Sequence, residues 1–584
     1  MKLCIAEKPS VAKDLAQILG ANARHDGYFE GNGYLVSWTF GHLCTLKEPQ
    51  DYKEHWKYWK IEDLPIFPDK FGIKIKNNQG ISKQFELITK LVAKASEVIN
   101  CGDAGQEGEL IQRWVLLKAK CSVPVKRLWI SSLTEEAIKN GFKKLQDASK
   151  YDNLFAAGNS RAIGDWVLGI NGTRLYTKKF GKDKTTLSVG RVQTPTLAMI
   201  VKRHHEIAQF TVEHYWELKT TYRETEFTCQ IKRLNSKERA IEGVEYLKDK
   251  AFKIISYKQK EGKEGNPRLY DLTSLQVESN KIFGHSAEET LKSIQNLYEK
   301  KLVSYPRVDT TYLTEDLHPK VSGILGNLKD YAHLTAPVLD KPIKKSKSIF
   351  NNKKITDHHA IIPTGIQAQG LQGIELEIYD LICKRFIAVF YPVCKVSNTT
   401  VLGKVEKLDF KTSGKQIIDP GWRVVYAEKN AARKSDENVL PLFEKGEEGP
   451  HAPFFHEGKT SPPKYYTEAT LLRSMESAGK LVEDEDMREL MKENGIGRPS
   501  TRANIIETLF KRKYIERKKK NIHATTLGIH LIGTIRSDLL KSPELTGQWE
   551  NKLRQIEKGK YTSAQFKAEL YTMIRGLTDE VIFG

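Results

Sequence analysis

The sequence is poor in cysteine. Its 584 residues include seven cysteines, and no two of them form a C-x-x-C pair. Zinc ribbons are built on such pairs, and small secreted folds need a dense set of disulfides. The scatter therefore excludes a zinc ribbon and disfavours a disulfide framework, so we expect ordinary buried thiols.

Three further absences narrow the class of protein. The chain has no G-x-x-x-x-G-K-[ST] phosphate loop, so any chemistry on phosphates is expected to proceed without ATP hydrolysis. No apolar run approaches the roughly 20 residues that span a bilayer. The first eight residues, MKLCIAEK, lack the apolar core of a signal peptide. We expect a cytoplasmic protein with no membrane contact.

Positive charge is what the chain has in excess. The formal net charge is +20, from 93 Lys and Arg against 73 Asp and Glu. Such an excess favours a polyanionic partner, with nucleic acid as the first candidate. A basic surface that binds nothing would have the same composition. The length suggests about three to five domains.

The first 150 residues alternate between strand-like and helix-like patterns. Strands are expected at residues 2–6, 34–38 and 97–100, and helices at residues 10–19, 81–95 and 108–120, the first with Ser10 as its N-cap. This alternation predicts an α/β domain with a mainly parallel sheet. Ligands collect at the carboxyl ends of such strands, where Glu7 and Asp103 fall.

Beyond residue 150 the pattern changes several times. A basic stretch at residues 341–354 is expected to be an exposed loop, and residues 429–464 a linker or an irregular edge. Similar kinds of structure flank residues 273–400, which suggests that this piece is inserted into a domain that resumes after it. The expected order is helices at 151–210, strands at 212–255, helices at 273–302, strands at 395–426 and helices from 467 onward.

Three carboxylates lie in the segment DAGQEGE at residues 103–109, at a predicted strand–helix junction. Mg²⁺ prefers oxygen ligands and usually takes one or two carboxylates, so Asp103, Glu107 and the distant Glu7 form a candidate site. Acids at a helix N-terminus also suit the helix dipole, and from this segment alone that explanation is slightly favoured. Lys8 stands beside Glu7, a pair that can move a proton and neutralise phosphate charge.

The segment SYPRVDTTY at residues 304–312 places a tyrosine beside an arginine and an acid. A tyrosine can attack phosphorus and form a phosphotyrosine ester, which conserves the energy of the broken bond. Arg307 can hold the phosphate with paired N–H donors, and Asp309 can orient Arg307. Tyr305 is one of 23 tyrosines, so the segment alone makes it a weak candidate.

The segment DHHAIIPT at residues 357–364 adds two histidines. One of them can hydrogen-bond a phosphate oxygen. From the segment alone, a metal-free surface pair is the favoured explanation, and no cysteine at ligand spacing supports zinc.

Seven segments, in this order, are similar to the motifs of type IA DNA topoisomerases, most closely those of the bacterial topoisomerase III branch. Each is weak alone, but the ordered set spans the chain and is specific. They are IAEKPS (5–10), TFGHL (39–43), DAGQEGE (103–109), LSVGRVQTP (187–195), SYPRVD (304–309), HHAIIPT (358–364) and GIGRPST (495–501).

The resemblance implies a multidomain toroid of α/β, α and β parts. The expected parts are a Toprim α/β domain at 1–150, a helical DNA-gripping domain at 151–211 and 465–584, a strand-rich arch at 212–272 and 400–464, and a helical domain at 273–399 that carries the active-site tyrosine.

The resemblance also implies roles for single residues. Tyr305 would attack a DNA phosphate and become linked to the 5′ end, while Lys8 and Arg307 stabilise charge. Glu7 would assist proton transfer and His358 the geometry of cleavage. Mg²⁺ would be held by Glu7, Asp103 and Glu107, mainly for rejoining. The expected DNA contacts are His42, Arg161, Asn171, Arg174, Arg191, Gln193, Gln295, Glu299, Asp309, Arg498, Ser500 and Thr501.

The implied activity is ATP-independent cleavage of one DNA strand, passage of another strand and religation, which relaxes negative supercoils and separates catenated DNA. Single-stranded, negatively supercoiled and catenated DNA are the expected partners, bound at the nucleoid through phosphate contacts and base stacking. A monomer is expected. The resemblance also suggests a helicase as a partner, but no residue in the sequence identifies one.

The acidic motif departs from the family pattern Asp-x-Asp-x-Glu. Gly105 stands where the middle acid is expected, and Gln106 where an arginine usually follows. We therefore predict weaker but functional Mg²⁺ binding. Two other classes stay open on the sequence alone. A non-catalytic nucleic-acid-binding relative would suit the altered motif, whereas a Toprim nuclease or primase would not need residues 304–309 and 358–364.

Overall fold

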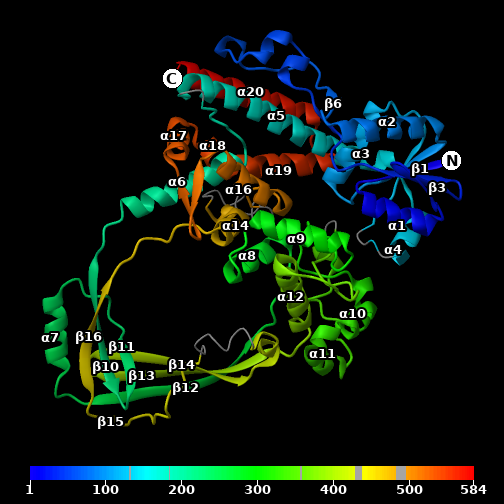
Figure 1. Ribbon diagram of the computed structural model, residues 1–584. Helices are drawn as coiled ribbons and strands as arrows, with labels where there is room; N and C mark the ends of the chain where they lie inside the picture. The colour runs from blue at the N-terminus through cyan, green and yellow to red at the C-terminus, as the bar shows by residue number, and fades with distance from the viewer. Residues whose placement is uncertain are drawn as a thin grey trace.

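The computed structural model describes residues 1–130, 133, 135–182, 185–355, 358–427, 437–481 and 495–583. Figure 1 shows them arranged as a ring around an open centre. Within these ranges, no helix is both long enough and apolar enough to cross a membrane.

A seven-stranded sheet organises the first 150 residues. In its centre, β1 is parallel to β4 and β7, and β7 is parallel to β8, whereas the pairs β2–β3, β3–β4 and β8–β9 are antiparallel. The predicted parallel arrangement therefore holds at the centre and not at the edges. The order is β2 (Ala23–His25), β3 (Tyr28–Gly31), β4 (Tyr34–Trp38), β1 (Lys2–Ala6), β7 (Glu97–Cys101), β8 (Val125–Arg127) and β9 (Gln146–Asp147).

Helices cover both faces of this sheet. On one face α2 (Gln79–Lys94) and α3 (Gln106–Lys118) pack on Leu3 and Ile5, and on the other α1 (Pro9–Leu19) and α4 (Glu135–Lys143) pack on Cys4 and Ala6. Burial on both faces explains why β1 is almost wholly apolar. Lys8, and not Ser10 as predicted, caps α1. The reason is Pro9, whose fixed φ suits the first helical position.

A lobe of residues 49–75 leaves this sheet and lies over two long helices, α5 (Asp152–Phe180) and α20 (Ser563–Phe583) (Figure 1). It is built from short 3₁₀ turns, η1 (Pro49–Asp51), η2 (Glu54–Lys57) and η3 (Ile61–Asp63). Its last strand, β6 (Ile73–Ile75), returns to pair with β5 (Cys44–Leu46).

The helical region combines two distant stretches of chain around one hydrophobic core. A two-stranded hairpin, β17 (Ile515–Lys518) and β18 (Asn521–Ala524), interrupts its second stretch. The helices are α5, α6 (Gln193–Ala208), α14 (Glu468–Glu476), α16 (Pro499–Lys511), α17 (Thr526–Thr534), α18 (Asp538–Lys541), α19 (Glu544–Glu557) and α20.

A second seven-stranded sheet forms the arch, and every adjacent pair in it is antiparallel. One face packs on α7 (Lys237–Leu247). The order is β15 (Glu448–Gly449), β12 (Phe252–Glu264), β13 (Cys394–Val405), β14 (Leu408–Asp419), β11 (Thr225–Cys229), β10 (His214–Tyr222) and β16 (Ala452–Lys459).

The sequence predicts a linker or an irregular edge at residues 429–464, but where β16 forms they are a regular strand at the edge of the sheet. This strand pairs with β10 at the sheet edge from His214–Lys459 to Thr221–Ala452. Gly458, one of the residues that suggested a linker, sits against the Tyr215 ring, where a side chain would not fit. The beginning of that segment, residues 429–436, lies outside the described ranges.

The tyrosine region closes the ring between the arch and the N-terminal sheet (Figure 1). The helical stretch expected at 273–302 is two helices, because Ser286 caps the second one in a reciprocal pair with Glu289. The basic stretch 341–354 is not wholly an exposed loop, since Phe350 is buried. The helices are α8 (Leu272–Ile282), α9 (Ala287–Glu299), α10 (Val321–Asn327), α11 (Ala332–Leu339) and α12 (Gly373–Ala388).

Candidate active site

Two acids meet at the carboxyl ends of adjacent strands, β1 and β7. Ala6 pairs with Cys101, which brings Glu7 next to the loop that carries Asp103. The Asp103 backbone N–H lies 3.4 Å from Glu7 Oε2. Burial, and then the charge of Asp103, raise the pKa of Glu7 to about 7. Two like charges held together in a buried place favour a proton or a cation between them.

The loop that carries Asp103 is fixed from below by a buried ion pair. Arg127 Nε lies 2.9 Å from Glu109 Oε2, with both side chains fully buried. The same guanidinium donates to the carbonyls of Gly102 and Asp103, each at 2.7 Å. Glu109 therefore supports the loop and does not face the site. The sequence pattern missed Arg127, which no motif contains.

Lys8 lies between an acid and two aromatic rings. Its Nζ is 3.7 Å from Asp103 Oδ2, 4.6 Å from the centre of the Tyr305 ring and 5.6 Å from that of Tyr298. Both Lys8 Nζ and Asp103 Oδ2 are buried, and neither has a hydrogen-bond partner within the described residues. The site thus holds a cation and an oxygen whose hydrogen bonds are unmade.

Tyr305 is brought to this place by a short bridge with the histidine segment. Ser304 N donates to the Ile362 carbonyl at 2.9 Å, and Ser304 Oγ accepts from Ile362 N at 3.0 Å. The Tyr305 ring lies 4.4 Å from His358 and 5.4 Å, edge-on, from Tyr298. Burial, and then the charges of Asp103 and Glu7, raise the pKa of Tyr305 well above its usual range. The phenol is therefore protonated at rest.

The two neighbouring histidines differ. His359 is buried, and its Nδ1–H donates to the Ala360 carbonyl at 2.7 Å. Burial lowers the pKa of His359 to about 4, so it is a neutral core residue. His358 is the one beside Tyr305. We call Glu7, Lys8, Asp103, Tyr305 and His358 the reaction centre.

Glu107, the third predicted metal ligand, turns to a different partner. Its Oε1 lies 2.5 Å from His42 Nε2. Burial opposes its ionisation, but His42, Arg498 and Arg161 outweigh burial and lower the pKa of Glu107. Across the described ranges, no three His, Cys, Asp or Glu side chains are grouped to hold a metal ion. Glu7 and Asp103 remain, and two adjacent carboxylates, one with an unpaired oxygen, fit a divalent cation that keeps several waters.

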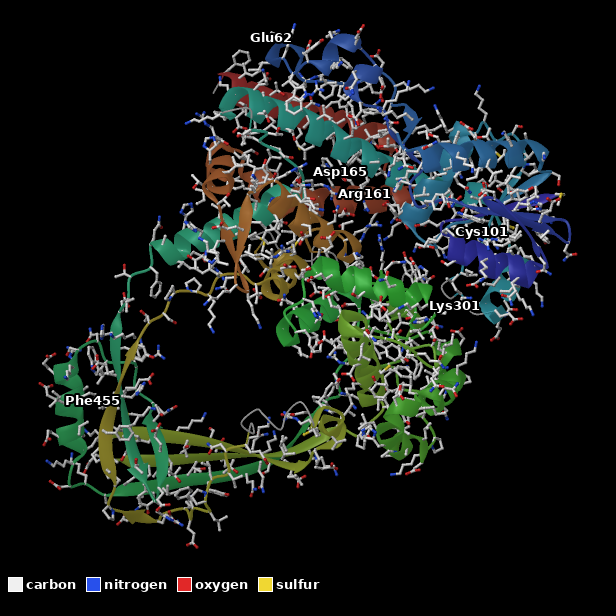
Figure 2. The ribbon with its side chains drawn as sticks, viewed as in Figure 1. Glu62, Cys101, Arg161, Asp165, Lys301 and Phe455 are labelled. Carbon is white, nitrogen blue, oxygen red and sulfur yellow. The ribbon has the colours of Figure 1, made fainter. Side chains whose placement is uncertain are left out.

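A groove of about 1010 Å³ adjoins the reaction centre, and we call it the arginine groove. Arg161 and Asp165, which Figure 2 labels, lie on α5 and line this groove. Its lining includes His42, Lys57, Trp59, Glu107, Arg161, Asp165, Thr173, Arg174, Arg191, Gln193, Arg307, Arg498, Thr501, Arg512 and Glu550.

Glu550 ties the arginines of this groove together. Its carboxylate accepts from Arg161 at 2.5 Å and from Arg191 at 2.9 Å, and Asp165 accepts from Arg191 at 3.0 Å. Burial works against the ionised carboxylate, but Arg161, Arg191 and Arg498 prevail and lower the pKa of Glu550 to about 2. Burial and the charge of Arg498 lower the pKa of Arg161 to about 10. No sequence motif pointed to Glu550.

Other predicted DNA contacts also line cavities near the centre. Arg498 donates to Gln106 at 3.1 Å, and Gln193 accepts from Arg512 at 2.5 Å. Arg307 is exposed in the groove, and Asp309 lines an adjoining cavity of about 580 Å³. Gln295 donates to Glu299 at 3.0 Å on α9, and Glu299 lines the cavity behind Tyr305. Ser500 belongs to α16, and its side chain lies outside the described part of the structure.

Two predicted DNA contacts are engaged with the lobe of residues 49–75. Asn171 is 1% exposed, and its amide accepts from Ile66 N at 2.5 Å and donates to the Ile66 carbonyl at 3.1 Å. Arg174 is 4% exposed and donates to the Trp56 carbonyl at 2.7 Å. Both side chains thus hydrogen-bond the lobe of residues 49–75, while Arg174 also lines the arginine groove and its Nε has no hydrogen-bond partner among the described residues.

Comparisons with known proteins agree with this arrangement. The family model described as DNA topoisomerase matches residues 149–568, and the Toprim domain model matches residues 2–133. The chain is 40% identical to the DNA topoisomerase 3 of Bacillus licheniformis, over 97% of this chain and 80% of that protein. It is 39% identical to the DNA topoisomerase 3 of Bacillus subtilis, over 96% of this chain and 79% of that protein.

The fold is also similar to a solved structure, that of full-length topoisomerase I from Thermotoga maritima. The TM-score is 0.73 at 22% identity, over 99% of this chain and 90% of that one. At this identity the likeness concerns the fold. The family models and the relatives together show that the chain belongs to the type IA DNA topoisomerases, in the topoisomerase III branch.

Proposed function

We propose that this protein cuts one strand of DNA with Tyr305, holds the 5′ end as a phosphotyrosine ester, lets another strand pass and reseals the cut without ATP. The observation that carries the proposal is the convergence of Lys8, Asp103 and Tyr305. Residues some 300 positions apart in the chain meet, with the ammonium 4.6 Å from the phenol ring. Relaxation of negative supercoils and separation of catenated DNA follow from such a cycle.

Cleavage requires the phenol to lose its proton, the leaving oxygen to gain one, and the negative charge that develops on the phosphate to be stabilised. The Tyr305 oxygen attacks phosphorus, and the bond from phosphorus to the 3′ oxygen breaks. Asp103, which interacts with the phenol, is placed to accept its proton. Glu7, with its pKa near 7, can give a proton to the leaving oxygen and take it back on resealing. Lys8 supplies positive charge where the phosphate gains negative charge, and Arg307 can hold the same phosphate.

The Toprim domain binds a divalent metal ion, and we propose that the ion is Mg²⁺ with Glu7 and Asp103 as its protein ligands. Bound there, it would neutralise phosphate charge during rejoining. Glu107 faces the groove with His42 and contributes to the field around the ion from a distance. We also propose that the protein acts at the nucleoid, in the cytoplasm. A helicase partner and a monomeric state remain predictions.

The arginine groove supports the holding of a single strand. Its guanidinium groups suit phosphates, and the net charge of +20 favours DNA approach. A strand phosphate that enters can take the place that Glu550 now occupies for Arg161 and Arg191. The groove therefore grips the strand while the reaction centre cuts it.

The test is a covalent trap. Single-stranded oligonucleotide labelled at its 3′ end is incubated with the protein and denatured at once, and the labelled peptide is mapped. We expect the label on the peptide that contains Tyr305. A label on another residue, or no adduct under conditions where the DNA is cut, would refute the assignment.

A further inference from the structure

The lobe of residues 49–75 carries aromatic side chains with different surroundings. Trp56 is buried, and Tyr58 is 63% exposed. Trp59 is half-buried and lines the arginine groove together with Lys57. In Figure 2 the lobe, marked by Glu62, lies across α5 from the labelled Arg161 and Asp165. Trp59 is therefore the aromatic ring that the lobe presents to the groove.

The lobe is held firmly on the helices beneath it. Asn171 brackets the Ile66 backbone through both its amide atoms, and Phe67 stacks on Tyr571 with ring centres 4.0 Å apart. Arg174 donates to the Trp56 carbonyl. These contacts fix the backbone on both sides of Trp59, so the ring has little freedom to lose on binding a ligand.

Arg174 also lies against the Trp59 ring. Its guanidinium carbon is 5.4 Å from the ring centre, within the range of a cation–π contact. Arg174 is buried, and burial lowers its pKa against the charges of Asp63 and Glu48. One side of the indole is thus packed on a buried cation, while the residue still borders the groove.

The position of Trp59 fits one base of a bound strand. Arg161 and Arg174 both lie on α5 and both line the groove. At 1.5 Å per helical residue they are about 20 Å apart. That is on the order of six stacked nucleotides at 3.4 Å each. Trp59, beside Arg174, therefore marks the end of the groove away from the Glu550 cluster.

We propose that Trp59 is a stacking platform for one base of single-stranded DNA at this end of the arginine groove. An aromatic ring on the wall of a basic groove is the usual means of holding an unpaired base. In this account Asn171 and Arg174 are positioning residues for Trp59. The platform rests on the proposed function, because it presumes that the groove holds a single strand.

The test scans one abasic nucleotide through an oligonucleotide of defined sequence and measures dissociation constants by fluorescence anisotropy. For the parent protein, we expect one position at which base loss weakens binding about tenfold, as expected for one stacked base. Trp59→Ala should weaken binding of the intact oligonucleotide about tenfold and show no further loss at that position, since the two changes remove one contact. Trp59→Phe should keep most of the affinity.

Tyr58→Ala is the matched control, since Tyr58 is adjacent, exposed and absent from the groove lining. It should bind all oligonucleotides as the parent does. Oligonucleotides too short to reach the lobe should be bound and cut equally by the parent and by Trp59→Ala. The platform would be overturned if Trp59→Ala lost the same affinity for short and for long oligonucleotides. It would also be overturned if Trp59→Ala bound long oligonucleotides with the affinity of the parent. If the parent forms no covalent adduct at all, the proposed function fails instead.

Discussion

The reaction centre and the arginine groove are neighbours that differ in how fully their charged groups are hydrogen-bonded. In the reaction centre, charged atoms lack hydrogen bonds: Lys8 Nζ and Asp103 Oδ2 are buried 3.7 Å apart, and neither has a hydrogen-bond partner among the described residues. The pKa values of Glu7 and Tyr305 are both raised, first of all by burial. A bound phosphate or cation would supply the partners that Lys8 Nζ and Asp103 Oδ2 lack.

In the arginine groove, Arg161 and Arg191 are already paired with acids. Glu550 accepts from Arg161 and Arg191, and its pKa is lowered to about 2 in spite of burial. Asp165 and Glu550 overcome burial to raise the pKa of Arg191. A strand must exchange these acids for its own phosphates. Substitutions in the reaction centre are therefore expected to affect the chemical step, whereas substitutions in the arginine groove are expected to affect stability and DNA affinity.

The largest effect is expected from Tyr305→Phe, which removes the nucleophile and leaves the ring packing in place. Relaxation of negatively supercoiled plasmid should fall to the background without enzyme, and no covalent adduct should form. Tyr298→Phe is the matched control, because Tyr298 packs edge-on against Tyr305 and has no role in bond breaking. Parental relaxation by Tyr305→Phe would remove Tyr305 from the chemistry.

The next largest effect is expected from Glu550→Gln, which removes the acid that Arg161 and Arg191 share. It leaves Arg161 and Arg191 buried without their shared acid, which should lower the free energy of unfolding by about 3 kcal/mol in urea denaturation. Asp165→Asn is the comparison: Asp165 also pairs with Arg191, but its side chain is 48% exposed, so the loss of stability should be smaller. Because the pKa of Glu550 is lowered to about 2, its contribution is present above pH 4.5 and is lost as the pH falls toward 2. Parental stability of Glu550→Gln would show that the pairing is not needed.

Glu7 should set the pH dependence of cleavage. Its pKa is raised to about 7, so the protonated form that serves the leaving oxygen is lost as the pH rises through 7. Single-turnover cleavage without added metal should therefore slow above that pH. Glu7→Gln should be slower throughout and lack the break. The same raised pKa means that the contribution of Glu7 to stability is present below pH 4.5 and is lost as the pH rises through 7. A break that survives in Glu7→Gln would assign it to another group.

The smallest effect is expected at the altered acidic motif. Gly105 caps α3 with an extended backbone, φ 172°, which any residue can adopt. Gly105→Asp should therefore fit and add a carboxylate near Glu7 and Asp103. We expect half-maximal relaxation at a roughly three- to tenfold lower Mg²⁺ concentration. Gly105→Asn, with the same shape and no charge, is the control. An unchanged Mg²⁺ requirement in Gly105→Asp would argue against a metal site weakened by the missing acid.

Local pattern predicted the parts of the site that lie close in sequence. Apolar strands ending at Ala6 and Cys101 placed Glu7 and Asp103 at one sheet edge, as parallel pairing requires. Helix geometry also explains an ambiguity in the acidic cluster. Glu107 and Glu109 are two residues apart on α3, so they point to different sides, one to His42 and one to Arg127.

Long-range partners could not be predicted from local pattern. Glu550 looks like any acid on a helix, and its partner Arg161 is 389 residues away. Asn171 and Arg174 carry polar side chains in a motif similar to DNA-contacting ones, but burial under the lobe redirects them. Tyr305 became a strong candidate only through the ordered family motifs, because periodicity cannot bring residue 305 to residue 8.

The reaction centre is proposed to carry the chemistry and the arginine groove to bind DNA. This separation is tested most directly by single-turnover cleavage at rising protein concentration, which yields a plateau rate and the protein concentration at half-saturation. Lys8→Met should lower the plateau about 100- to 1,000-fold, as loss of a charge-stabilising group does, and leave half-saturation unchanged. Arg498→Ala, in the groove, should raise half-saturation and keep the plateau. The account is contradicted if Lys8→Met changes only half-saturation, or if both variants change both quantities alike.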